Sequence, residues 1–336
     1  MTPSSPSVSP RSNTRLWDLV KIALAIVFLI FVVSKTDIQQ VKALGDKLSP
    51  GWLGLSFILF CLLTVLKALQ YHYLIGRRMQ FPRVLGVVIL QNGITNFVTT
   101  AAGIASYLTM LGAEKDVRLG RAAVSFLVAK MGDLIAVSLL LLLSTVWAWQ
   151  AVHPIRVLAL GLLALDLAII LVFFAAVLLR GRFVDILGGL VSALKLGRFG
   201  LIRKAMEFLK SLAEQDQAKA MRMVAAGTLY SLVYMVVVML WTYTRLRTFS
   251  LSLDMVAITF VGSVLQIASW VPVYVFGGLG ISETLSVYLY GIFGVDKPEI
   301  AAILLAGRLI FYLMSAAMLL YLPLQAVFQK NSSREA

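Results

Sequence analysis

The sequence is short of the residues that make disulfides and metal sites. Cys61 is the only cysteine among 336 residues, and His72 and His153 are the only histidines. A single cysteine excludes a disulfide within the chain, and this set cannot supply the ligands of a zinc site. Cys61 lies in an apolar stretch, which favours a packing role over a nucleophilic one. We therefore expect no metal and no other cofactor.

Charge is also scarce. Charged residues make up 14% of the chain and hydrophobic residues 60%, whereas soluble domains average about 25% charged and roughly 45–50% apolar residues. A soluble fold of this length could not bury so much apolar surface. Because apolar segments run from residue 17 to residue 328, we predict a polytopic integral membrane protein with one membrane domain, 17–328.

Acidic residues are outnumbered, 16 against 30 basic ones, which gives a net charge of +14. In a soluble protein such an excess would suggest nucleic acid. Here Lys and Arg gather in short loops between apolar segments, as the positive-inside rule predicts. We therefore expect membrane lipids as partners and no nucleic acid.

The first apolar run covers residues 17–34 and follows a Ser- and Pro-rich stretch, 1–16, that is typical of a disordered tail. No small-x-small cleavage site follows the run, which argues against a signal peptide and for an uncleaved span. We predict a protein of the plasma membrane, the inner membrane of a bacterium. Its tails, 1–16 and 329–336, are expected in the cytoplasm.

Eight apolar segments are long enough, or nearly so, to cross a bilayer, which takes about 20 residues. They cover residues 17–34, 51–75, 84–112, 121–148, 155–179, 222–246, 253–293 and 299–328. The third and seventh are interrupted by polar residues and glycines. In the third these are Gln91, Asn92, Asn96, Thr99, Thr100, Gly103 and Ser106, and in the seventh Gln266, Pro272, Gly277, Gly278, Gly280, Ser282 and Glu283. Each is either a kinked span or a re-entrant hairpin that lines a cavity.

The basic residues favour hairpins. Arg77 and Arg78 precede the third segment, and Lys115 and Arg118 follow it. Both loops therefore look cytoplasmic, which requires the chain of 84–112 to enter the membrane and return. The most basic stretch, 180–221, fits a cytoplasmic linker of amphipathic surface helices. The exceptions to this charge pattern are Lys42, Lys47, Arg245 and Arg247.

The predicted fold class is therefore all-α integral membrane. It has about six full transmembrane helices plus two re-entrant helical hairpins that enter from opposite faces. The alternative is eight transmembrane helices, two of them kinked.

An internal repeat relates residues 84–148 to residues 253–328. Gly103, Lys130 and Gln91 match Gly280, Arg308 and Gln266, at offsets of 177, 178 and 175 (280 − 103, 308 − 130 and 266 − 91). Two copies that enter from opposite faces form an inverted repeat, which is typical of alternating-access carriers.

Several ionisable residues fall inside these segments, where they are costly and usually face a bundle interior or a wet cavity. They are Lys130, Asp133, Asp166, Glu283 and Arg308, together with Lys67, which is nearer a helix end and is expected to snorkel to the interface.

Three roles for these residues stay open. The pairs Lys130–Asp133 and Arg308–Glu283 would hold the bundle together as salt bridges. Alternatively, Lys130 and Arg308 would share one cavity and bind an anionic headgroup, with hairpin half-helix N-termini at Gly103 and Gly280 adding N–H donors. In the third role Asp133, Asp166 or Glu283 would couple transport to protons. The candidate headgroup site comprises Lys130, Arg308, Asn96, Gly103, Gly278, Gly280 and Glu283.

The sequence contains no Gly-x-Ser-x-Gly elbow, His-Glu-x-x-His motif, Walker loop or Asp-rich metal motif. The run Gly277-Gly278-Leu279-Gly280 follows no buried strand, so it is a weak sign of a dinucleotide loop. We therefore predict that the chain is not an enzyme.

The second broken segment carries a family resemblance. Pro272, Gly277 to Glu283, Gly294-Val295, Ala301-Ala302 and Arg308 resemble the Pro…Gly-Gly-x-Gly-x-x-Glu…Arg pattern of the transmembrane region of lysylphosphatidylglycerol synthases, also called flippase-like domain proteins. Asn96, Gly103, Lys130 and Asp133 form a second match. The first hairpin departs from the family pattern of Pro and then Gly-Glu, because Thr99-Thr100 and Ala105-Ser106 stand there.

The resemblance implies a membrane domain that moves or handles lipids. The synthases also carry a cytoplasmic aminoacyltransferase domain, for which this chain, ending at Ala336, is expected to have no room. We therefore predict a flippase-like transporter of an anionic phospholipid or a polyprenyl-linked lipid. The alternative is an accessory subunit that presents lipid to a separate glycosyl- or acyltransferase.

Overall fold

The computed structural model describes residues 45, 48–113, 119–179, 188–189, 191–192, 217–269 and 281–325. Several predictions lie outside these residues. They are the span at 17–34, both tails, most of the linker at 180–221, and the glycines Gly277, Gly278 and Gly280.

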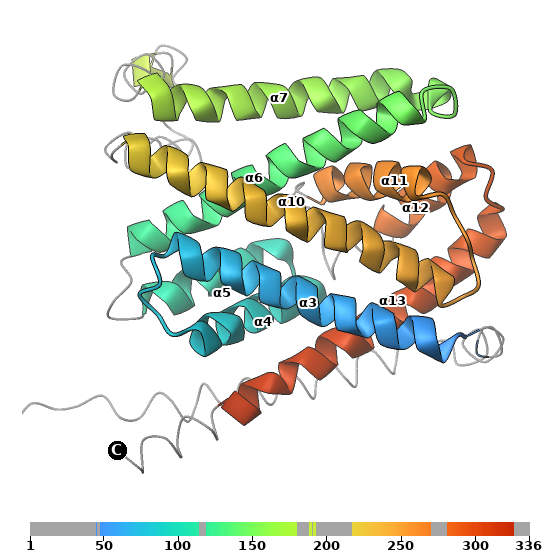
Figure 1. The fold of residues 1–336 in the computed structure, drawn as a ribbon, viewed down its shortest axis with the longest axis horizontal. Helices are drawn as coiled ribbons and strands as arrows, with labels where there is room; N and C mark the ends of the chain where they lie inside the picture. The colour runs from blue at the N-terminus through green and yellow to red at the C-terminus, as the bar shows by residue number, and fades with distance from the viewer. Residues whose placement is uncertain are drawn as a thin grey trace, which may run out of the picture.

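Every regular element in the described part of the chain is a helix (Figure 1). The elements are α3 (Pro50–Leu74), α4 (Phe81–Phe97), α5 (Thr100–Gly112), α6 (Leu119–Trp147), the 3₁₀ turn η1 (His153–Ile155), α7 (Arg156–Leu179), α10 (Gln217–Arg247), α11 (Met255–Ala268), α12 (Ile281–Ile292) and α13 (Lys297–Leu319). The predicted all-α class is confirmed.

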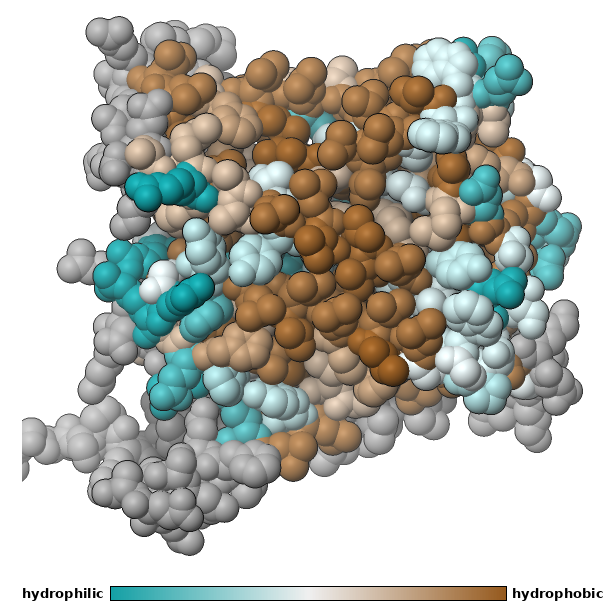
Figure 2. Space-filling view, viewed as in Figure 1, coloured by the Kyte–Doolittle hydropathy of each residue, from teal (hydrophilic) through white to brown (hydrophobic). Residues whose placement is uncertain are grey.

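Five of these helices, α3, α6, α7, α10 and α13, are long and apolar enough to cross a membrane. The 25 residues of α3 rise about 37 Å, which exceeds the ~30 Å hydrocarbon core. Their outer faces are apolar, as on α7, where Val157 is 86% exposed. Figure 2 shows a broad hydrophobic belt across the middle of the molecule, with hydrophilic residues toward both ends. The chain is an integral membrane protein.

The third predicted segment is two helices rather than one. Helix α4 ends at Phe97, and Val98 leaves the helical conformation with φ −120° and ψ −89°. Thr99 then caps α5, since its Oγ1 accepts a hydrogen bond from Ala102 N at 3.0 Å. The two helices pack beside each other. Gly103 permits this contact, because a Cβ there would collide with the Thr95 hydroxyl and come within 3.0 Å of the Gln91 carbonyl oxygen.

The seventh segment is likewise divided, into α11 and α12. Asp254 caps α11 by accepting from Val256 N at 3.1 Å. The two helices contact each other and lie at the end of the molecule opposite to the start of α4 (Figure 1). Thus both polar interruptions predicted from the sequence separate helices of 12 to 17 residues.

The helix contacts in the first half of the chain correspond in part to those in the second half. Helix α4 packs against α13 and α11 packs against α6, whereas α5 and α12 pack against the long helices that follow them, α6 and α13. The helices that precede the two pairs, α3 and α10, pack against each other. The relation is approximate, because α6 also packs extensively along α10 whereas α3 and α13 touch only slightly.

Two hydrogen bonds fix which helix ends lie together. Ser49 N, before α3, donates to Thr248 O, after α10, at 2.9 Å. At the other end, Gln325 Nε2 donates to the Pro82 carbonyl oxygen at the start of α4, at 2.9 Å. Gln325, the last described residue, therefore lies beside the start of the α4–α5 pair.

Candidate functional site

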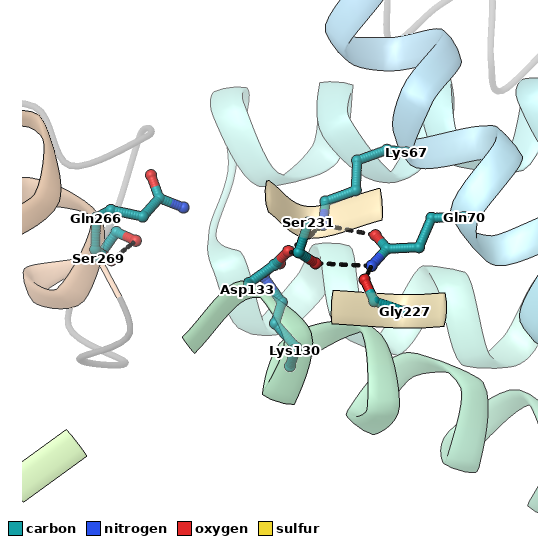
Figure 3. Close-up of polar contacts among 8 residues, drawn as sticks. All are labelled: Lys67, Gln70, Lys130, Asp133, Gly227, Ser231, Gln266 and Ser269. Atoms are coloured by element: carbon teal, nitrogen blue, oxygen red, sulfur yellow. Dashed lines mark hydrogen bonds and ion pairs between the residues drawn. The ribbon is translucent and has the colours of Figure 1, made fainter. Parts of the chain in front are cut away.

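A charged network lies buried where α3, α6 and α10 meet (Figure 3). Lys67 Nζ donates to both carboxylate oxygens of Asp133, at 2.6 and 2.8 Å, and to Gln70 Oε1 at 2.9 Å. Ser231 Oγ donates to Asp133 Oδ1 at 2.7 Å. The ring of Tyr234 faces Lys67 Nζ, with its centroid 4.5 Å away. All of Lys67, Gln70, Asp133 and Ser231 are less than a tenth exposed, so the Lys67–Asp133 ion pair is buried among hydrogen-bonding partners.

Two glycines allow the helices to meet so closely. A Cβ on Gly132 of α6 would lie 2.9 Å from the carbonyl carbon and oxygen of Gly227 on α10. Gln70 Nε2 bridges from α3 to the same Gly227 oxygen at 2.9 Å and to Ser231 Oγ at 2.8 Å. The close crossing therefore brings Asp133 within reach of α3.

The structure corrects the prediction for Lys67. It does not snorkel, because its ammonium group is the main partner of Asp133. The predicted pair of Lys130 and Asp133 is present but longer, at 3.8 Å, and the Lys130 side chain is 32% exposed against 11% for Lys67. Lys67 is therefore the structural cation of this network, and Lys130 is its accessible one.

Lys130 lies where one face of α6 becomes accessible. On that face Leu134, Val137 and Leu141 are buried, and α11 packs against this helix. One turn before Lys130, Phe126 is partly exposed, and its ring centroid lies 5.8 Å from Lys130 Nζ. The Gln266 side chain on α11 points toward Asp133 and Lys130 (Figure 3). A polar ligand beside Lys130 would meet its ammonium group.

A second charged cluster joins α12 and α13. Arg308 is paired with Glu283, with Nη2 2.5 Å and Nε 2.7 Å from Oε1. Arg308 Nη2 also donates to Ser282 Oγ at 2.6 Å. The predicted Arg308–Glu283 pair is thus present. Its side chains are 13% and 14% exposed, so the pair is buried less completely than Lys67 and Asp133.

The second cluster is flanked by aromatic rings and by another arginine. The centroids of Phe311 and Tyr312 lie 5.7 and 5.8 Å from the Arg308 guanidinium. Tyr312 stacks on Phe97, the last residue of α4, at 5.5 Å. Arg245 of α10 lies beside α13 next to this cluster. Its Cδ would lie 3.8 Å from a Cβ on Gly307, the residue next to Arg308.

The other predicted site residues lie in different surroundings. Asn96 Nδ2 donates to Ser315 Oγ at 3.2 Å and lines a small cavity between α3, α4 and α13. That cavity is lined by Phe60, Thr64, Ile89, Asn92, Gly93, Asn96, Ser315 and Met318. Asp166 is buried on α7 and accepts from Ser138 Oγ at 3.0 Å.

The expected donor role of Gly103 needs correction. Helix α5 begins at Thr100 rather than at Gly103, and the Gly103 amide donates to the Thr99 carbonyl oxygen at 3.0 Å inside that helix. Gly103 therefore serves close helix packing, and its N–H group is not available to a ligand. The corresponding role of Gly280 concerns residues outside those described.

Sequence reasoning did not select Gln70, Ser231 or Arg245 as site residues. Lys67 and Gln70 are spaced i and i+3, and this spacing on one face of an apolar helix was the available signal. Ser231 carries no such signal, because a lone serine is common in membrane helices.

The comparison with known families agrees with this architecture. The family described as the lysylphosphatidylglycerol synthase transmembrane region matches residues 19–318, most of the chain. The chain belongs to this family. No curated protein and no solved structure matches it. As a member of the lysylphosphatidylglycerol synthase transmembrane family it is a membrane domain of a lipid-related family, and interaction with lipids is the coarse function that membership supports.

Proposed function

We propose that the protein moves an anionic phospholipid or a polyprenyl-linked lipid between the two leaflets of the membrane. The observation that carries this proposal is a cation at the corresponding position of each of two long helices, α6 and α13. Lys130 and Arg308 each lie 11 residues after the start of their helix (130 − 119 and 308 − 297). Eleven residues rise about 16 Å, roughly half of the ~30 Å core.

The two pairs of short helices are, in this proposal, re-entrant hairpins. The 13 residues of α5 and the 12 of α12 span only about 18–20 Å, which is too short to cross the core. Because α4 and α5 pack side by side, they return the chain to the face from which it entered. The α11–α12 pair would do the same from the opposite face, which supports an inverted repeat and alternating access.

Each hairpin would open or cover one cation. The tip of α4 reaches α13 through the Phe97–Tyr312 stack, one turn from Arg308, and α11 covers the face of α6 beyond Lys130. A headgroup phosphate would bind Arg308 or Lys130 while the acyl chains stay in the bilayer. Asp133 and Glu283 orient these cations, and proton coupling through Asp133, Asp166 or Glu283 remains a prediction.

The test is a leaflet-exchange measurement with the purified protein in vesicles. A trace of fluorescent phosphatidylglycerol is placed in both leaflets, and dithionite then destroys only the label that reaches the outer surface. We expect dithionite to remove nearly all label from protein-containing vesicles, and only the outer-leaflet label from protein-free ones. Equal protection in both would contradict transport.

The accessory-subunit alternative makes a different prediction in the same assay. A subunit that only presents lipid would leave the inner-leaflet label protected. It would instead be purified from its native membrane together with a glycosyl- or acyltransferase. A protein that moves the label alone excludes a purely accessory role.

A further inference from the structure

The small cavity between α3, α4 and α13 is lined by polar side chains from all three helices. Thr64 comes from α3, Asn92 and Asn96 come from α4, and Ser315 comes from α13. Among the described residues that line the cavity, none carries an ionisable side chain. The chemistry of this space is therefore that of amides and hydroxyls, and it is separate from both charged clusters.

The cavity follows from the way in which the three helices pack. Gly93 brings α4 close to α13, because a Cβ there would lie 2.8 Å from Leu319 Cδ2. Helices α3 and α13 touch only slightly, at a place where Cys61 Sγ lies 3.5 Å from Met318 Sδ. Helix α4 thus packs on both neighbours, and the cavity occupies the space that remains where the three helices meet.

Part of the hydrogen-bonding capacity in this cavity is unused. The Asn92 carboxamide has no hydrogen-bond partner within the described part of the chain. Asn96 Nδ2 donates to Ser315 Oγ at 3.2 Å, and Thr64 Oγ1 donates to the Phe60 carbonyl oxygen at 3.2 Å. The side-chain oxygen of Asn96 and the hydroxyl hydrogen of Ser315 are left without a protein partner among the described residues.

These groups suit a hydroxyl group as ligand. A hydroxyl donates one hydrogen bond and accepts two, so an amide N–H and an amide oxygen can satisfy it together. An ion would meet no opposite charge in this space. An apolar group would leave the amides unpaired inside the membrane, which is costly.

We propose that this cavity binds a hydroxyl group in the headgroup of the transported lipid, with Asn92 as its main contact and Asn96 and Ser315 beside it. The inference rests on the proposed transport and names the chemical class of the headgroup. That class is a polyol joined through phosphate, either glycerol or a ring such as a sugar.

The cavity lies along the face of α13 that carries Arg308. Ser315 follows Arg308 by seven residues (315 − 308), nearly two helical turns, so both lie on one face about 10 Å apart along the axis. Phe60 of the cavity packs on Phe311 with centroids 5.9 Å apart, and the Phe311 ring flanks the Arg308 guanidinium. A lipid whose phosphate binds Arg308 would therefore reach the cavity along the same helix face.

The hydroxyl preference is tested in the leaflet-exchange assay with three labelled lipids of equal acyl chains and equal charge, namely phosphatidylglycerol, phosphatidylinositol and phosphatidylpropanol. Phosphatidylpropanol keeps the headgroup carbons of phosphatidylglycerol and lacks both hydroxyls. After subtraction of the rate in protein-free vesicles, we expect a hydroxylated lipid to move about tenfold faster than phosphatidylpropanol, since that factor corresponds to the loss of one or two ordinary hydrogen bonds.

The outcomes separate the two proposals. Faster movement of phosphatidylglycerol identifies glycerol as the source of the hydroxyl, and faster movement of phosphatidylinositol identifies a ring. Equal rates for all three lipids would overturn the hydroxyl site and leave transport intact. Movement of none of them would overturn transport itself.

Asn92→Leu tests the site itself, and the lipid series with the wild-type protein stands independently of whether this variant folds. The two side chains are similar in size, so we expect folded protein by gel filtration and a loss of the difference between the hydroxylated lipid and phosphatidylpropanol. Thr145→Val is the matched control, because Thr145 Oγ1 is a buried group without a partner in the described part of the chain, on α6 outside the cavity. The control should keep the preference. Folded Asn92→Leu protein that also keeps it would overturn the proposal.

Discussion

Replacing Asp133 with alanine is expected to lower the free energy of unfolding by about 3–5 kcal/mol, because a buried cation is then left without its partner. Lys67 donates to both oxygens of Asp133, and its side chain is 11% exposed. Ser231 loses its acceptor in the same step. The effect is measured by thermal or denaturant unfolding in detergent, where the variant should unfold well before the wild type.

Asp166→Ala is the matched control for this substitution. Asp166 is also a buried aspartate in a long helix, but its hydrogen bond comes from the Ser138 hydroxyl, so its removal leaves no cation behind. The double variant Lys67→Met/Asp133→Leu removes both charges and should recover most of the lost stability. Asp133→Ala protein as stable as Asp166→Ala protein would show that the network does not hold the bundle.

Arg308→Ala is expected to slow the movement of fluorescent phosphatidylglycerol about a hundredfold. Hydrogen bonds to a charged partner are worth about 1.5–3 kcal/mol each, and a hundredfold change in rate corresponds to ~2.7 kcal/mol in the barrier. Arg308→Lys keeps the charge but loses the planar fork that binds phosphate in a bidentate way, so it should give an intermediate rate. The measurement is the dithionite assay at matched protein-to-lipid ratio.

Arg156→Ala serves as the control arginine substitution. Arg156 stacks on Trp149 outside both clusters, with the guanidinium 3.8 Å from the ring centroid, and the variant should move lipid at the wild-type rate. Because Arg308→Ala leaves Glu283 without its cation, the variant Arg308→Ala/Glu283→Ala tests whether misfolding causes the loss. Folded Arg308→Ala protein that moves lipid at the wild-type rate would contradict the headgroup assignment.

Much of the fold could be predicted from the sequence, because the bilayer imposes a strict length and polarity rule. The uninterrupted apolar runs correspond to the helices α3, α6, α7, α10 and α13. The polar breaks near Thr99 and before Ser282 coincide with the divisions between short helices. The positions of Arg77, Arg78, Lys115 and Arg118 indicated a return of the chain to one face, and the side-by-side packing of α4 and α5 agrees with it.

The site was less predictable, since it depends on which helices touch. Arg308 and Glu283 could be paired from a family motif, and the structure contains that pair. The choice of Lys67 over Lys130 as the main partner of Asp133 follows from the close approach of Gly132 and Gly227, and no local pattern specifies that contact. For the same reason Arg245, which reads as an interfacial residue near the end of α10, was not assigned to the second cluster.

The proposed transport depends on insertion of the two short-helix pairs from opposite faces of the membrane. This insertion is tested most directly by single cysteines in a Cys61→Ala background, placed at Arg78 and Ala113 on either side of α4–α5, and at Ser250 and Gly294 on either side of α11–α12. With an impermeant thiol reagent on oriented membranes, we expect positions 78 and 113 to react from one side and 250 and 294 from the other. Labelling of 78 and 113 from opposite sides would show a kinked span and contradict the inverted hairpins.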